Sequence, residues 1–282
     1  MAKFTTLISV EELTAGLQQK NWVVIDCRFN LQQPAEGLRD FHLGHIPGAR
    51  YAHLDDDLAA PITLSSGRHP LPTVAQFVAT LRRLGISNQS QVIAYDGAAG
   101  GIAARLWWML RWLGHDAVAV LDGGWSAWSA AGGAVEREKQ APEPGGFEAR
   151  ERPGWILSTA ELLESLEAKR PPVLVDAREA ARYEGLEEPI DAIAGRVPGA
   201  LSFPYAENLD GNGLWRSKDY LQDAWRQVLD GAPPDDWAIM CGSGVTACHL
   251  ALSAERAGLT PPRLYAGSWS EWIKDPSRPR LP

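Results

Sequence analysis

The sequence predicts an α/β protein with two tandem domains of one fold, each a mostly parallel sheet with helices on both faces. Three observations predict this fold class. Short apolar runs alternate with amphipathic patterns, a set of motifs recurs once in the same order, and the length of 282 residues suits about two domains. Hydrophobic residues make up 45% of the chain, so each half has enough material for a core.

Four motifs of the first half recur in the second half at similar spacing. WVVIDCR at 22–28 matches PVLVDAR at 172–178, and GHIPGA at 44–49 matches GRVPGA at 195–200. VIAYD at 92–96 matches WAIMC at 237–241, and GWSAW at 124–128 matches SWSEW at 268–272. We therefore expect a first domain at 1–135, a linker at 136–153 that lacks apolar periodicity, and a second domain at 154–282.

In the first half, the apolar runs predict strands near 23–26, 92–95 and 117–121. Amphipathic patterns predict helices over 10–19, 74–84 and 103–113. The first of these helices has a capping-box spacing from Ser9 to Glu12. In the second half, the run 237–240 predicts a short buried strand, and a helical pattern begins at Ala247. Ligands of such folds sit at the carboxyl ends of the strands.

Cys241 stands at one of these strand ends and is the candidate nucleophile. The loop that follows it leads into a helix, where inward-pointing N–H groups and the helix dipole favour the reactive thiolate. Gly242 and Gly244 let the backbone curl closely around the sulfur. A small buried structural cysteine is the alternative interpretation. Asp96 holds the matching position in the first half, and a carboxylate is a poor sulfur nucleophile, so we expect one working site.

Composition narrows the function classes. The net charge of −8 argues against nonspecific nucleic-acid binding, and no apolar run approaches the ~20 residues of a membrane helix. The N-terminus lacks the pattern of a signal peptide, so we expect a cytoplasmic location. Cys27, Cys241 and Cys248 fit neither a disulfide framework nor a metal pair, and we expect no metal and no cofactor. Cys248 is predicted to pack within its helix, with a resolving-cysteine role as the alternative.

These motifs resemble those of the tandem-domain rhodanese family of sulfurtransferases. The resemblance rests on DCR at 26–28 with DAR at 176–178, on the two PGA-containing motifs, on CGSGVTA at 241–247 and on GSWSEW at 267–272. The loop is similar to that of the 3-mercaptopyruvate branch, which is small and neutral after the cysteine. The thiosulfate branch usually carries basic residues there.

The resemblance implies a two-step sulfur transfer. Cys241 would take a sulfane sulfur from 3-mercaptopyruvate and become a persulfide, with thiosulfate as the alternative donor. Loop residues would surround the outer sulfur; these are Gly242, Gly244, Val245 and Thr246. A thiol acceptor such as a thioredoxin-like protein, or cyanide, would then remove the sulfur.

The resemblance also implies a proton relay. Ser243 would be linked to His69 and Asp55 of the first domain, and the relay would deliver a proton to the leaving group. The alternatives are a surface-loop histidine at 69 and a solvated acid at 55.

For donor binding, the resemblance implies that Arg182 holds the carboxylate of the donor, a task suited to a planar guanidinium. The alternative is a surface ion pair with Glu179 or Glu184. Many mercaptopyruvate enzymes have a second arginine shortly before the GRVPGA position, where this chain has Ile190.

Two other function classes compete with sulfur transfer. A cysteine phosphatase needs an arginine that closes the loop around the phosphate, and 242–247 holds neither arginine nor lysine. A noncatalytic interaction module would not need Cys241 in an intact loop. Both therefore rank below a sulfurtransferase.

Overall fold

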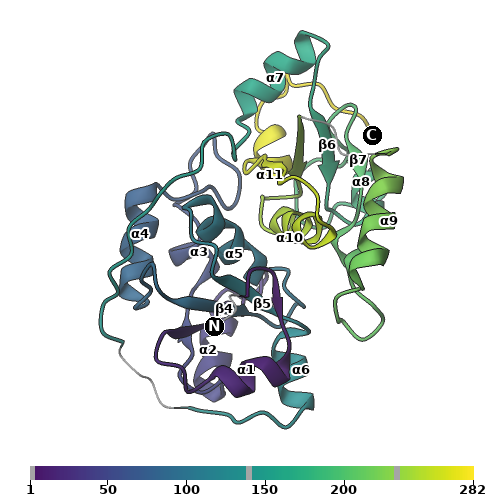
Figure 1. Cartoon of the computed structure of the whole chain (residues 1–282). Helices are drawn as coiled ribbons and strands as arrows, with labels where there is room; N and C mark the ends of the chain where they lie inside the picture. Colours follow the sequence, from purple (N-terminus) through teal and green to yellow (C-terminus); the bar gives the residue numbers. More distant parts are fainter. Residues whose placement is uncertain (1–3, 138–141, 232–235) are drawn as a thin grey trace. The chain divides into compact units, whose positions relative to one another are not determined.

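The computed structural model describes residues 4–137, 142–231 and 236–282 (Figure 1). The chain forms two compact units. The described residues of 1–60, 71–152 and 211–215 make up the first unit, and those of 61–70, 153–210 and 216–282 make up the second. The predicted boundaries treat each domain as one continuous stretch, whereas here 61–70 lies with the second unit and 211–215 with the first.

The first unit contains a parallel five-stranded sheet with the strand order β1-β5-β4-β2-β3. Its strands are β1 (Leu7–Ile8), β2 (Trp22–Asp26), β3 (Arg50–Tyr51), β4 (Gln91–Tyr95) and β5 (Val118–Leu121). Its helices are α1 (Val10–Gly16), α2 (Glu36–Leu43), α3 (Leu54–Asp57), α4 (Val74–Arg83), α5 (Ala103–Trp112) and α6 (Gly124–Ala130).

The second unit contains a parallel four-stranded sheet with the order β7-β6-β8-β9. Its strands are β6 (Val173–Asp176), β7 (Leu201–Ser202), β8 (Trp237–Met240) and β9 (Arg263–Leu264). Its helices are α7 (Thr159–Glu167), α8 (Ala180–Tyr183), the 3₁₀ helix η1 (Tyr205–Asn208), α9 (Lys218–Val228), α10 (Ala247–Ala257) and α11 (Ser268–Trp272).

The two sheets repeat one topology, which confirms the predicted fold class. The order β3-β2-β4-β5 of the first unit returns as β7-β6-β8-β9 in the second. Asp26 pairs with Tyr95 across the first sheet, and Asp176 pairs with Met240 across the second. Because these pairs are equivalent, the residues that follow β4 and β8 occupy equivalent places at the carboxyl edges of the sheets.

The predicted helices begin where the sequence indicates and end slightly earlier. Ser9 caps α1 through the expected capping box with Glu12, yet α1 ends at Gly16 rather than at 19. The bulky ring of Trp22 lies where a Cβ on Gly16 would project, so this glycine lets β2 approach the helix end closely. Among the described residues, no helix is both long and apolar enough to cross a bilayer.

A buried ion pair anchors the loop after the second strand of each repeat. The guanidinium of Arg28 binds the carboxylate of Asp26 and donates to the carbonyl of Gly44 at 2.7 Å. Arg178 binds Asp176 in the same way and donates to the carbonyl of Gly195 at 2.8 Å. Each arginine thus ties the start of its loop to the glycine of the following PGA-containing motif.

Candidate active site

Cys241 is the first residue after β8 and lies almost fully buried in a loop of small residues. Its Sγ accepts the backbone N–H of Gly244 at 3.1 Å and that of Ser243 at 3.4 Å. The loop runs into α10, whose first residue is Ala247. These two N–H groups direct their partial positive charges toward the sulfur, and this arrangement stabilises a negative charge on it.

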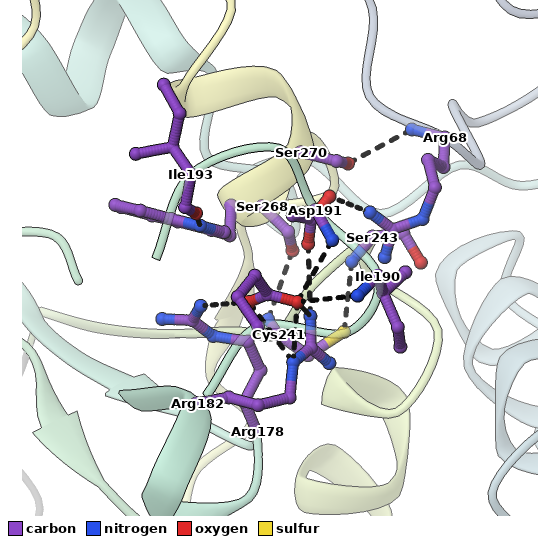
Figure 2. A network of polar contacts seen from close by, with 12 residues as sticks. Arg68, Arg178, Arg182, Ile190, Asp191, Ile193, Cys241, Ser243, Ser268 and Ser270 are labelled. Atoms are coloured by element: carbon purple, nitrogen blue, oxygen red, sulfur yellow. Dashed lines mark hydrogen bonds and ion pairs between the residues drawn. The ribbon is translucent and has the colours of Figure 1, made fainter. Parts of the chain in front are cut away.

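The start of α11 holds this loop in place (Figure 2). The Trp269 N–H donates to the carbonyl of Cys241 at 3.0 Å, and the Ser270 N–H donates to that of Gly242 at 2.9 Å. The Cys241 N–H in turn donates to Ser268 Oγ at 3.1 Å. Three groups of α11, two backbone N–H groups and one hydroxyl, therefore fix the peptides on both sides of the candidate nucleophile.

His69 lies within hydrogen-bond distance of Ser243, although 174 residues separate them in the sequence. His69 Nδ1 is 2.8 Å from Ser243 Oγ, and the histidine is 5% exposed. Its segment packs against α11, because the Arg68 N–H donates to Ser270 Oγ at 3.0 Å and a Cβ on Gly67 would lie 2.6 Å from the Gly267 carbonyl oxygen. The alternative of a surface-loop histidine is therefore wrong.

Asp55 lies in the short helix α3 of the first unit and is half-buried. Burial raises the pKa of its carboxyl above the ordinary value, the charge of His53 lowers it and that of Asp56 raises it. A link from Asp55 to His69 and Ser243 stays a prediction.

Arg182 is paired, but not with the residues named as alternatives. Its Nη2 lies 2.8 Å from Glu188 Oε1 and 3.0 Å from Asp191 Oδ2. The alternative of a surface pair with Glu179 or Glu184 is wrong, because the side chain of Arg182 is 12% exposed and pairs with Glu188 and Asp191. A Cβ on Gly242 would lie 3.3 Å from Arg182 Nη2, so the guanidinium borders the cysteine loop.

A second arginine, Arg68, also borders the loop. A Cβ on Gly242 would lie 2.8 Å from Arg68 Nη2. Arg68 Nη1 forms a very short ion pair with Asp191 Oδ1. Asp191 therefore bridges Arg68 and Arg182, and Figure 2 shows all three side chains beside the loop.

The pKa values of Glu188 and Asp191, the two carboxylates that pair with these arginines, are shifted in opposite directions. Burial alone would raise the pKa of Glu188. Hydrogen bonds from Arg182 and from the Asp191 and Ile190 N–H groups, together with the charge of Arg182, outweigh the effect of burial, so this pKa lies below the ordinary value. Burial raises the pKa of Asp191 above its ordinary value, against the opposing charges of Arg68 and Arg182. A third guanidinium joins this cluster, because Arg178 Nη1 lies 3.6 Å from Glu188 Oε2.

Sequence reasoning missed Arg68, Glu188 and Asp191. Arg68 and Asp191 are 123 residues apart, so no local pattern joins them. The available signals were the position of Arg68 directly before His69 and the acidic residues next to Ile190. Ile190, where a second arginine was sought, is 44% exposed and donates its backbone N–H to Glu188 Oε1.

Four loop residues were expected to surround the sulfur: Gly242, Gly244, Val245 and Thr246. Within the described part of the chain, Gly244 is the one of these four whose backbone N–H donates to Cys241 Sγ. Ser243, predicted as a relay residue, supplies the second N–H. Val245 is buried, and Thr246 stands at the N-cap of α10. Cys248 donates its thiol to the Gly244 carbonyl at 3.3 Å, in keeping with packing inside α10.

The matching loop of the first unit is closed by its own side chain. The Asp96 carboxylate accepts four backbone N–H groups at 2.7–2.9 Å, from Ala98, Gly100, Ile102 and Ala103. A carboxylate here holds the N–H groups that a loop of this kind could otherwise offer to a sulfur anion. This geometry agrees with a single nucleophilic loop, the one in the second unit.

The model of the rhodanese-like domain matches the chain twice, over residues 9–131 and 158–275. The chain is 42% identical over 275 residues to a Pseudomonas aeruginosa protein named "Probable 3-mercaptopyruvate sulfurtransferase", covering 97% of this chain and 96% of that one. It is 33% identical to the thiosulfate sulfurtransferase of Gallus gallus, covering 93% and 90%. The solved 3-mercaptopyruvate sulfurtransferase from Leishmania major superposes with a TM-score of 0.84 at 29% identity, covering 95% of this chain and 74% of that one.

Proposed function

This chain belongs to the rhodanese-like family, and on that premise we propose that it is a sulfurtransferase that moves sulfur from 3-mercaptopyruvate through a persulfide on Cys241. The observation that carries the proposal is the buried Cys241 Sγ, which receives two backbone N–H groups at the carboxyl end of β8. The same two groups can stabilise the negative charge of a persulfide.

In the first step, the Cys241 thiolate attacks the sulfur of 3-mercaptopyruvate. An S–S bond forms, the C–S bond of the donor breaks, and its electron pair leaves as the enolate of pyruvate. The proton of the donor thiol ends on the methyl carbon, which leaves pyruvate and an ionised persulfide on the enzyme.

His69 and Ser243 are the groups proposed to carry that proton. Their 2.8 Å contact links a hydroxyl to an imidazole that can hold a proton, as general acid catalysis requires. Asp55 completes the relay in this proposal by orienting the imidazole.

In the second step, a thiolate of the acceptor attacks the outer sulfur, and the Cys241 thiolate leaves. A thioredoxin-like dithiol protein is the proposed acceptor, because its second thiol can release the sulfur as sulfide while a disulfide forms. The cytoplasmic location expected from the sequence stays a prediction.

Arg182 is proposed to bind the donor carboxylate, since its guanidinium borders Gly242. Gly242, Val245 and Thr246 form the remainder of the proposed donor-binding loop. Thiosulfate is the second candidate donor, because the Gallus gallus relative is named for it. The neutral loop at 242–244 offers little charge to this dianion, which favours the singly charged donor.

Initial rates with 3-mercaptopyruvate and with thiosulfate, measured side by side with one dithiol acceptor, test the proposal. We expect a higher kcat/KM for 3-mercaptopyruvate, and intact-mass spectra that show one added sulfur atom on the wild type. Equal or better turnover of thiosulfate would overturn the donor assignment. Failure of both donors to load the protein would overturn the assignment as a sulfurtransferase.

A further inference from the structure

Two loops of the second unit, which we call the framing loops, lie on either side of the cysteine loop. They are residues 61–70 and 185–194. The ion pair of Arg68 with Asp191 joins them to each other. Each is also tied to α11, through the backbone N–H of Arg68 in one loop and the carbonyl of Ile193 in the other (Figure 2).

The two most exposed large hydrophobic side chains that the structure describes both lie on the framing loops. Leu64 is 97% exposed and Leu186 is 73% exposed. Ile62, Ile190 and Ile193 are exposed as well. Single exposed apolar residues are common on protein surfaces, whereas a group of them around one site typically marks a surface that another molecule covers.

Ordered backbone presents both leucines. Thr63 and Ser66 close a turn around Leu64, because each donates its backbone N–H to the side-chain oxygen of the other, at 2.8 and 3.1 Å. The Leu186 N–H donates to the Ala181 carbonyl at 2.9 Å, at the end of α8. Backbone held in this way has little conformational entropy left to lose when a partner covers the side chain.

The framing loops fall within the footprint of a protein that docks at Cys241. Leu64 precedes His69 by five residues, which span at most about 18 Å, and the turn at 63–66 shortens this separation. His69 itself contacts Ser243 in the cysteine loop. A standard interface covers roughly 800 Å² on each partner, which corresponds to a disc about 16 Å in radius. A protein acceptor therefore covers the exposed leucines, whereas a small thiol does not need them.

We propose that the framing loops are the docking surface for a dithiol protein that accepts the sulfur, with Leu64 and Leu186 as its apolar anchors. The inference rests on the proposed sulfurtransferase function and deepens it, because it assigns the surface that the acceptor contacts. In the docked complex, an acceptor thiolate attacks the outer sulfur of the persulfide, and Cys241 leaves as a thiolate. The second thiol of the acceptor then attacks the acceptor sulfur that carries the transferred atom, so that a disulfide forms and HS⁻ and a proton are released.

The chemistry of the reaction favours this occupant over a second copy of the chain. Cys27, Cys241 and Cys248 are all buried, so another copy presents no exposed thiol to take the sulfur. The partner that fits carries two reactive thiols and an apolar surface around the thiol that attacks, which the two leucines contact.

The test compares a protein acceptor with a small one, using 3-mercaptopyruvate as the donor. The acceptors are a bacterial thioredoxin, kept reduced by thioredoxin reductase and NADPH, and dithiothreitol. Sulfide release is measured for the wild type, Leu64→Ser, the double variant Leu64→Ser/Leu186→Ser, and Leu43→Ser. Leu43 provides the matched control, since it is a leucine of α2 that is 65% exposed and lies outside the framing loops.

For the double variant we expect the KM for thioredoxin to rise by about ten- to a hundredfold with kcat retained, because two apolar anchors of the complex are lost. Leu64→Ser alone should raise this KM by about three- to tenfold. With dithiothreitol, both variants should match the wild type, and so should their rates of sulfur loading by intact mass. Leu43→Ser should match the wild type with both acceptors.

Several results would overturn the inference. A KM for thioredoxin that rises no more in the double variant than in Leu43→Ser would show that the leucines do not contact the acceptor. An equal loss with dithiothreitol would assign the leucines to the site itself, and a change in oligomeric mass by light scattering would assign them to a contact between copies of the chain. A wild type that delivers sulfur to dithiothreitol but not to thioredoxin would overturn it too. If the wild type takes no sulfur from 3-mercaptopyruvate, the proposed function fails first, and this inference with it.

Discussion

Replacing Gly244 by alanine is expected to slow sulfur loading through the geometry of one peptide group. Gly244 has φ +75°, a left-handed conformation that costs an L-residue roughly 1–2 kcal/mol. A methyl group there would lie 2.5 Å from the Ala266 carbonyl oxygen and 3.0 Å from its Cα. Because both contacts are with backbone, the loop must shift rather than a side chain.

That shift moves the N–H that lies 3.1 Å from Cys241 Sγ. Removing one such donor from an anion site typically lowers the rate by about 10²–10³, or roughly 2.7–4 kcal/mol. We therefore expect Gly244→Ala to load sulfur about a hundredfold more slowly and to unfold at least 1 kcal/mol more easily. Stopped-flow loading with rapid quench and intact-mass detection measures the rate, and urea unfolding measures the stability.

Gly154→Ala is the matched control, because Gly154 has φ +73° but no heavy atom within 4 Å of its Cβ position. Gly154→Ala should have a lower free energy of unfolding, because alanine disfavours the positive φ, but it should keep the wild-type rate of sulfur loading. If a folded Gly244→Ala loads sulfur as fast as the wild type, the two N–H groups do not stabilise the reacting sulfur and the reasoning is refuted.

Four further outcomes are expected. Cys241→Ser should accept no sulfur by intact mass while Cys248→Ala still does; loading of the Cys241 variant would contradict this. His69→Gln should lower kcat with 3-mercaptopyruvate by about a hundredfold or more and affect thiosulfate much less, since sulfite leaves without a proton; equal losses would argue against proton delivery. Asp55→Asn should produce the same donor-selective loss to a smaller degree, and a wild-type kcat would remove Asp55 from the relay. Glu188→Gln should be less stable than the wild type above about pH 4.5, because a carboxyl group with a lowered pKa stabilises the fold only while it is ionised. The difference in the free energy of unfolding should disappear as the pH falls through the lowered native pKa of Glu188. Urea midpoints of the two proteins that move further apart on acidification would contradict this.

Local patterns were sufficient to place the candidate nucleophile between a strand and a helix. The apolar run before Cys241 and the helical pattern from Ala247 both reflect burial of neighbouring residues, and β8 and α10 begin and end close to the predicted positions. The equivalence of Asp96 and Cys241 followed from the internal repeat, which the register of the two sheets confirms.

The surroundings of the nucleophile depend on contacts that no local pattern records. Residues 61–70 precede α4 in sequence, yet Gly67 and Arg68 pack on α11, about two hundred residues later. The resemblance placed Arg182 at the loop, but no pattern in the sequence indicated Arg68 there. Arg68 comes to the loop from a distant segment, so its charge beside Gly242 is a property of the tertiary fold.

The carboxylate of Asp96 places different structural demands on the two equivalent loops of the duplication. Its two oxygens are bonded covalently to the chain and occupy four N–H groups permanently. In the proposed mechanism, the loop of Cys241 must instead be stable both with a bare thiolate and with an extra sulfur atom, once in every turnover. On that proposal only the second half has to accommodate two occupants of different size, and substitutions that narrow its loop should be tolerated less well than equivalent changes around Asp96.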